Sequence, residues 1–310
     1  MSAAGVRDAE PGAGLGEALF VWALATVLAL AVLVTYARLP ATELYNTSVE
    51  GLAGGLGRAL VVANFPVALA AVAVAALVAD RGRSRAVDAL ALAAVVLCLV
   101  VAVPGVVDQS DLDATWVNAI PALGVALALA LTVEVVRRRG LGPLPRRVPG
   151  DGLRIAVGFV VAVISVPWLF AELGFYADRV PGLGRLVFAE EIVPEPGQPA
   201  LRAVHLGHHH GTDGAFLALV ALALTRQLGL MARRRLRLAT AAYLSLMLAY
   251  GLWNAVQDVW LEQLAKRGTV AVEIPGVLRP DLSLAWLLLL AGAAALYAVL
   301  IRRPAAPTPR

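Results

Sequence analysis

The sequence predicts an all-α, polytopic membrane protein: a bundle of about eight transmembrane helices with both termini in the cytoplasm. Of the 310 residues, 60% are hydrophobic and 15% are charged, whereas soluble domains have roughly 45–50% and 25%. The apolar residues recur in runs of about 20, the length that crosses ~30 Å of hydrocarbon as a helix. Arginine is concentrated in alternate loops between these runs.

Eight apolar runs are long enough to span a bilayer. They are expected at residues 19–37, 59–79, 86–107, 119–136, 153–173, 214–231, 238–259 and 282–301. The first run is interpreted as a span and not as a signal peptide, because acidic residues precede it and no clear cleavage site follows. Residues 1–18 then form a cytoplasmic segment, residues 174–213 form the longest outer loop, and residues 304–310 form a short disordered tail.

The charged loops predict the orientation. One side of the bundle carries most of the arginines, among them Arg81, Arg83, Arg85, Arg137, Arg138, Arg139, Arg233, Arg234 and Arg235. The positive-inside rule places this side, and with it both termini, in the cytoplasm. Topology therefore explains the pI of about 9.6 without nucleic-acid binding. The Ala/Arg-rich composition suggests a bacterial protein, so we expect multi-pass insertion in the plasma (cytoplasmic, or cell inner) membrane.

The spans carry no ionisable residue at mid-depth, which argues against an ion-coupled transporter. Prolines interrupt three of them, at Pro66, Pro104 and Pro167, and each is expected to bend its helix. Most carboxylates and all four histidines lie on the outer side. Arg58, at the start of the second span, is expected to line an outer cavity.

Span seven carries a polar stripe on one helical face. Its members recur every three or four residues and are Tyr243, Met247, Tyr250, Asn254 and Gln257. Because such a stripe is costly against lipid, it should face the bundle. Two interpretations are open, namely interhelical hydrogen bonds that hold span seven in place and a polar cavity open to the outside.

The sharpest local motif is a histidine cluster just before span six, formed by His205, His208, His209 and His210. In a helix His205 and His209 share a face, whereas in an extended chain His208 and His210 do, so either geometry offers two imidazoles to one ion. Nitrogen and oxygen ligands without thiolate suit Zn, Cu(II) or Fe. A solvated or partner-facing loop is the competing interpretation.

Three residues are candidates for catalysis, namely Asp258 and Glu262, which extend the edge of the span-seven stripe, and His205. Asp213 is expected to cap the start of span six. Trp168 is expected to be an interfacial aromatic residue.

The leading functional hypothesis is a membrane protein with an extracytoplasmic His/carboxylate site that acts on a lipid-linked or hydrophobic substrate, with a divalent metal as candidate cofactor. One alternative is a channel or transporter for a neutral or metal solute. Another is a non-catalytic subunit that docks a protein partner through its outer loops.

Overall fold

A computed structural model describes residues 15–44, 46–108, 111–141, 147–176, 180–182, 191–193, 201–206 and 210–302. Its α-helices are α1 (Leu15–Arg38), α2 (Gly51–Asn64), α3 (Pro66–Gly82), α4 (Arg85–Leu99), α5 (Ala119–Arg139), α6 (Asp151–Ile164), α7 (Val166–Glu172), α8 (His210–Thr225), α9 (Arg234–Trp260) and α10 (Leu284–Arg302). Short 3-10 helices lie at Ala41–Glu43, Val100–Ala102, Trp116–Asn118 and Leu228–Leu230, and a π-helical turn, Leu261–Ala265, extends α9. The strands β1 (Ile192–Val193) and β2 (Leu201–Arg202) pair antiparallel.

The helices confirm the predicted fold class. Within the described ranges, six are long and apolar enough to cross a membrane, and the number rises to eight if each of two bent pairs is one span. The pairs are α2 with α3, bent by 45°, and α6 with α7, bent by 55°. Pro66 and Pro167 lie at the two bends, as expected for a residue that removes a helical hydrogen bond. The protein is therefore a multi-pass membrane protein in contact with lipid.

The third proline does not bend a span. Helix α4 continues as a 3-10 turn to Ala102, so Pro104 follows the helix instead of interrupting it. The expected kink in span three is wrong, because the helix ends before the proline.

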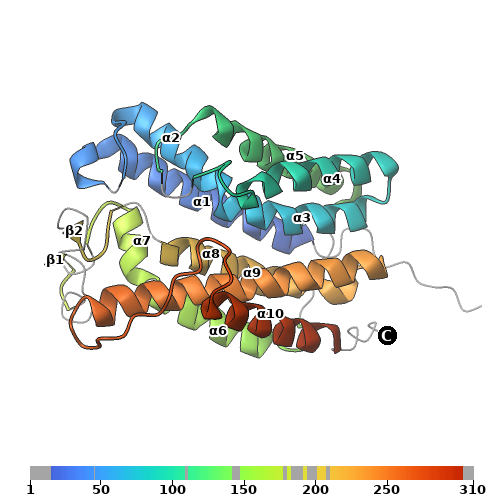
Figure 1. Cartoon of the computed structure of the whole chain (residues 1–310). Helices are drawn as coiled ribbons and strands as arrows, with labels where there is room; N and C mark the ends of the chain where they lie inside the picture. The colour runs from blue at the N-terminus through green and yellow to red at the C-terminus, as the bar shows by residue number, and fades with distance from the viewer. Residues whose placement is uncertain are drawn as a thin grey trace, which may run out of the picture.

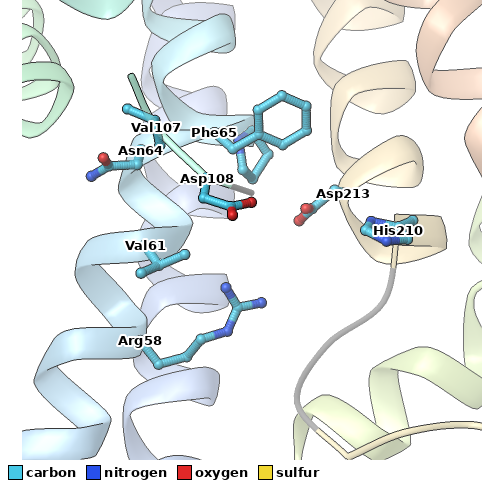
Figure 2. Close-up of a pocket in the computed structure, with 9 residues that line it drawn as sticks. Arg58, Val61, Asn64, Phe65, Val107, Asp108, His210 and Asp213 are labelled. Carbon is cyan, nitrogen blue, oxygen red and sulfur yellow. The ribbon is translucent and has the colours of Figure 1, made fainter. Parts of the chain in front are cut away.

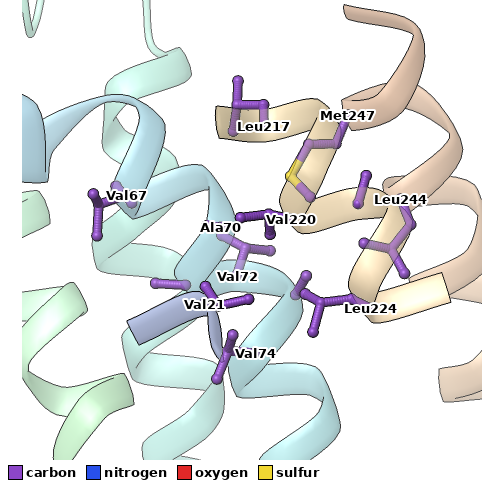
Figure 3. Close-up of a cluster of buried hydrophobic side chains, with 14 of the residues drawn as sticks. Val21, Val67, Ala70, Val72, Val74, Leu217, Val220, Leu224, Leu244 and Met247 are labelled. Atoms are coloured by element: carbon purple, nitrogen blue, oxygen red, sulfur yellow. The ribbon is translucent and has the colours of Figure 1, made fainter. Parts of the chain in front are cut away.

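The helices form two layers, with α1–α5 in one and α6–α10 in the other (Figure 1). The layers meet through a large cluster of buried aliphatic side chains. Figure 3 shows Val21 of α1 and Val67–Val74 of α3 against Leu217–Leu224 of α8 and Leu244 and Met247 of α9. Lipid provides no hydrophobic drive for helix association, so this interface depends on close packing.

Glycine brings α8 and α9 into very close contact near the end of the bundle predicted to face outside, here called the outer end. A Cβ at Gly251 would lie 2.6 Å from the backbone oxygen of Gly214, and a Cβ at Gly214 would lie equally close to the oxygen of Gly251. Only glycine at both positions permits this crossing, which small residues typically allow in membrane proteins.

At the opposite, arginine-rich end, ion pairs join the two layers. Arg226 pairs with Glu17 at 3.3 Å, and Arg233 pairs with Asp88 at 2.8 Å. Asp80, which is buried, accepts the backbone N–H groups of Ala232 and Arg233. These contacts hold the predicted cytoplasmic end of the bundle closed.

Candidate functional site

Charged side chains from four helices converge inside the outer end of the bundle. Arg58 (α2), Glu172 (α7), Asp258 (α9) and Glu262 (π-helical turn) are only 4%, 3%, 7% and 5% exposed. His210 and Asp213 join them from the first turn of α8. We call these six residues the outer polar cluster. Because a buried charge is costly unless it is paired, such a cluster in a membrane protein is a candidate functional site.

Two carboxylates of the outer polar cluster, Asp258 and Glu262, accept hydrogen bonds from neighbouring helices. Asp258 Oδ2 accepts the backbone N–H of Gly211 at 2.7 Å, where a carboxylate is favoured by the partial positive charge at the start of α8. Glu262 Oε2 accepts the indole N–H of Trp168 at 2.6 Å. The π-helical turn carries Glu262, and such turns are frequent at functional sites.

Trp168 is therefore not the interfacial aromatic residue that we expected. Its side chain is 0% exposed and packs against the start of α8, where a Cβ on Gly211 would lie 2.3 Å from the indole ring. Trp168 directly follows Pro167, beside the 55° bend between α6 and α7.

Arg58 is the central cation of the cluster. It interacts electrostatically with Glu172, His210 and Asp213, and its guanidinium carbon lies 5.8 Å from the centre of the Tyr36 ring. Figure 2 shows Arg58 and Asp213 with their polar ends directed into the space between α2 and α8.

A small pocket lies at this space. Its polar lining residues are Arg58, Asn64, Asp108, His210 and Asp213. Its volume of about 10 Å³ is enough for roughly one water-sized group.

A much larger groove, of about 780 Å³, adjoins the pocket. Both are lined by Phe65, Val107 and Asp108, so the groove and the pocket lie next to each other. Tyr250 contacts Phe65 edge-on at 6.3 Å and Trp286 at 6.2 Å between ring centres, which gives the groove an aromatic wall.

The groove is apolar in its deeper part and polar at its outer rim. Leu69, Leu246 and Met247 line the deeper part, whereas Asp111, Asp113 and Arg279 lie at the rim. On its edge Leu99 and Val103 are 37% and 47% exposed. A concave, mostly apolar site with a few polar groups at one end is typical of a ligand pocket.

Hydrogen bonds fix the walls around α2. Asn118 donates to Asn64 Oδ1 at 2.9 Å, and Asn64 donates to the Asn118 carbonyl at 2.7 Å. Asp113 accepts from Thr47 Oγ1 at 2.6 Å and Ser48 Oγ at 2.5 Å. Burial alone would raise the pKa of Asp113, but the hydrogen bonds from Ser48 and Thr47 hold this pKa below its usual range. The loop that leads into the Arg58 helix is thereby anchored.

The predicted stripe on span seven divides between two environments. Tyr243 and Tyr250 line the groove, and the Tyr243 hydroxyl also donates to the Leu69 carbonyl of α3 at 2.7 Å. Asn254 is 2% exposed, and Gln257 is half-buried. Both interpretations of the stripe, an interhelical bond and a cavity wall, therefore hold for Tyr243.

The predicted histidine site is described only in part. His208 and His209 lie outside the described residues, whereas His205 and His210 interact electrostatically. Within the described ranges, no group of three or more His, Cys, Asp and Glu side chains is arranged to hold a metal ion. The metal site therefore stays a prediction.

Two residues of the pocket, Asp213 and Arg58, have positions or partners that the sequence did not predict. Asp213 is not a cap, because α8 begins at His210, one turn earlier than expected, and so Asp213 lies inside its first turn. Arg58 was expected to line an outer cavity, and it does, but its contact with carboxylates of α7 and α8 depends on the packing of the two layers. No spacing in the sequence indicates that contact.

Comparison of the chain with protein-family models, curated proteins and solved structures finds no match. The function is therefore argued from the site alone.

Replacing Trp168 with Phe tests the internal support of the cluster. We expect Trp168→Phe to destabilise the protein by about 1–3 kcal/mol, because it removes a hydrogen bond to the buried Glu262 carboxylate. Trp116→Phe is the matched control, since Trp116 is 81% exposed. Thermal unfolding in detergent measures both, and equal midpoints for the two variants would contradict this role of Trp168.

Proposed function

We propose that this protein is an integral membrane enzyme that acts on a lipid-like substrate at the outer face of the membrane. The observation that carries the proposal is that the apolar groove lies next to the charged pocket and shares Phe65, Val107 and Asp108 with it. A substrate chain would lie in the groove against Tyr243, Met247 and Tyr250, and its polar head would reach Arg58, His210 and Asp213.

The residues of the pocket suit acid–base chemistry on that head. Asp213 is a group that exchanges protons, and it lines the pocket from the same helical turn as His210. A half-buried carboxyl group of this kind can serve as a general acid or base. In this proposal the catalytic candidates Asp258 and Glu262 would act as positioning residues, through their hydrogen bonds with Gly211 and Trp168.

The shape of the groove supports an enzyme more than a transporter. Along α9 the groove extends inward as far as Tyr243, and the ion pairs of Glu17 and Asp88 close the layers at the arginine-rich end. A blind site of this form admits a substrate from one side. With the arginine-rich end inside, in the plasma membrane of a bacterium, that side is the outer one.

The enzyme is tested by its effect on membrane lipids. We expect cells that express the protein to lose or gain at least one lipid species, measured by mass spectrometry of the extracted membrane. Asp213→Asn should lower this turnover by about 100-fold or more, because a general acid or base is lost.

The control is Glu273→Gln, a change of an exposed carboxylate in the loop before α10, which should retain full turnover. Unchanged lipids, or full turnover by the Asp213 variant, would contradict the proposed function. In that case, co-purification of a second subunit would favour the docking alternative.

A divalent metal, Zn, Cu or Fe, is the second part of the proposal. His205 and His210 would supply two ligands, with at least one further ligand from His208 or His209. Metal analysis of the purified protein should give about one ion per chain, and that ion should be lost in the His205→Ala/His210→Ala double variant. If metal-free protein still turns over its lipid, the metal proposal is contradicted. The proposed enzyme function is then unaffected.

A further inference from the structure

We propose that the groove opens sideways to the outer leaflet of the bilayer, so that its ligand is a resident lipid of that leaflet. The lipid chain would lie across residues 102–105, which we call the side edge of the groove. This inference rests on the proposed function, because it names the source of the substrate that binds at the same site. Three observations carry it, namely the depth of the groove, the apolar side edge and the polar outer rim.

The groove lies at the depth of lipid chains. Tyr243 and Tyr250 line it, and they are roughly 14 and 24 Å along α9 from its start at Arg234, at 1.5 Å per residue. The hydrocarbon core of a bilayer is ~30 Å thick, so this wall runs from near the middle of the core into its outer half. Leu99, on the wall formed by the other layer, is roughly 21 Å from the start of α4 by the same measure.

The side edge is apolar and exposed. Its residues line the groove and also lie at the surface; they are Ala102, Val103, Pro104 and Gly105. Residues 103–105 form turns beyond the helical end of α4, and non-helical backbone at membrane depth is tolerated where it lines a cavity. Exposed apolar patches of this kind mark contact with a membrane or another partner, and at this depth the contact is lipid.

A lipid-facing strip of α4 leads into this edge. Its residues follow one another at steps of four, three and four, which places them on one side; they are Leu92, Val96, Leu99 and Val103. Leu92 and Val96 are 64% and 58% exposed, whereas Leu99 and Val103 also line the groove. The surface that faces lipid chains therefore passes into the groove without an intervening charged residue.

The outer rim of the groove, in contrast, is polar. Asp108, which follows α4, pairs at 3.5 Å with Arg279, which precedes α10. The Trp286 indole N–H donates to the Arg279 carbonyl at 2.7 Å, and tryptophan favours the boundary between hydrocarbon and head groups. The rim thus lies at the level of the head groups. An apolar chain meets charged groups at the rim and only apolar groups at the side edge, so the bilayer is the favoured source.

Photo-crosslinking in phosphatidylcholine nanodiscs tests the inference. The nanodiscs contain a trace of phosphatidylcholine with a diazirine on one chain, either next to the head group or at the chain end. Light inserts the probe into the nearest side chain, and mass spectrometry of the digested protein identifies that residue. Tyr250 and Met247 report on the inside of the groove, because they line it and are only 9% and 4% exposed.

We expect the probe next to the head group to label Tyr250 and the probe at the chain end to label Met247. Val103→Trp, which places a bulky ring at the side edge, should lower labelling of both residues by about tenfold, equivalent to roughly 1.4 kcal/mol. Val96→Trp is the matched control, since Val96 is an exposed valine of the same strip that does not line the groove, and it should label as wild type does. Leu99→Trp is the second variant if Val103→Trp does not fold.

Unchanged labelling in the Val103 and Leu99 variants would overturn the side opening and leave the groove and the proposed function in place. Labelling in the reverse order, with the chain end at Tyr250 and the head-group probe at Met247, would overturn the outer leaflet as the source. If neither probe labels the groove, the inference is also overturned. Lipid turnover by the same protein then decides the proposed function separately, because an enzyme that takes its substrate by another route would retain it.

Discussion

The hydrogen bond from the Gly211 N–H to the Asp258 carboxylate is the interaction on which the outer end of this protein depends. It joins the start of α8 to α9 inside the bundle, and so it fixes the helical turn that carries His210 and Asp213. Gly211 fits beneath the Trp168 ring, and the crossing of Gly214 and Gly251 holds the two helices together. A larger residue at any of these glycines would separate the pocket from its supports.

The cost of burying charge near a membrane organises the rest of the fold. At the arginine-rich end, the acidic side chains of α1, α3 and α4 are bound by partners from the other layer. At the outer end, Glu172 of α7 and Asp213 of α8 interact electrostatically with Arg58 of α2. The first arrangement joins the two layers, and the second forms a polar cluster within the outer end of the bundle.

The sequence predicted the all-helical, multi-span fold, because the length and hydropathy of the apolar runs follow from the thickness of the bilayer. It also predicted which helix face of span seven would turn inward. It did not predict that Trp168 and Glu262 would form a buried pair, because that contact joins residues far apart in the chain. Nor did it predict the place of Asp213, because the extra turn of α8 is stabilised by Asp258 from another helix.

The most direct test of a lipid-like ligand at this site is a cryo-electron microscopy map of the protein in lipid nanodiscs. We predict elongated density in the groove along Tyr243 and Tyr250, with one end at Asp213. A groove filled by the protein's own side chains would contradict this account, as would a water-filled path that continues between α3 and α9 to the arginine-rich end.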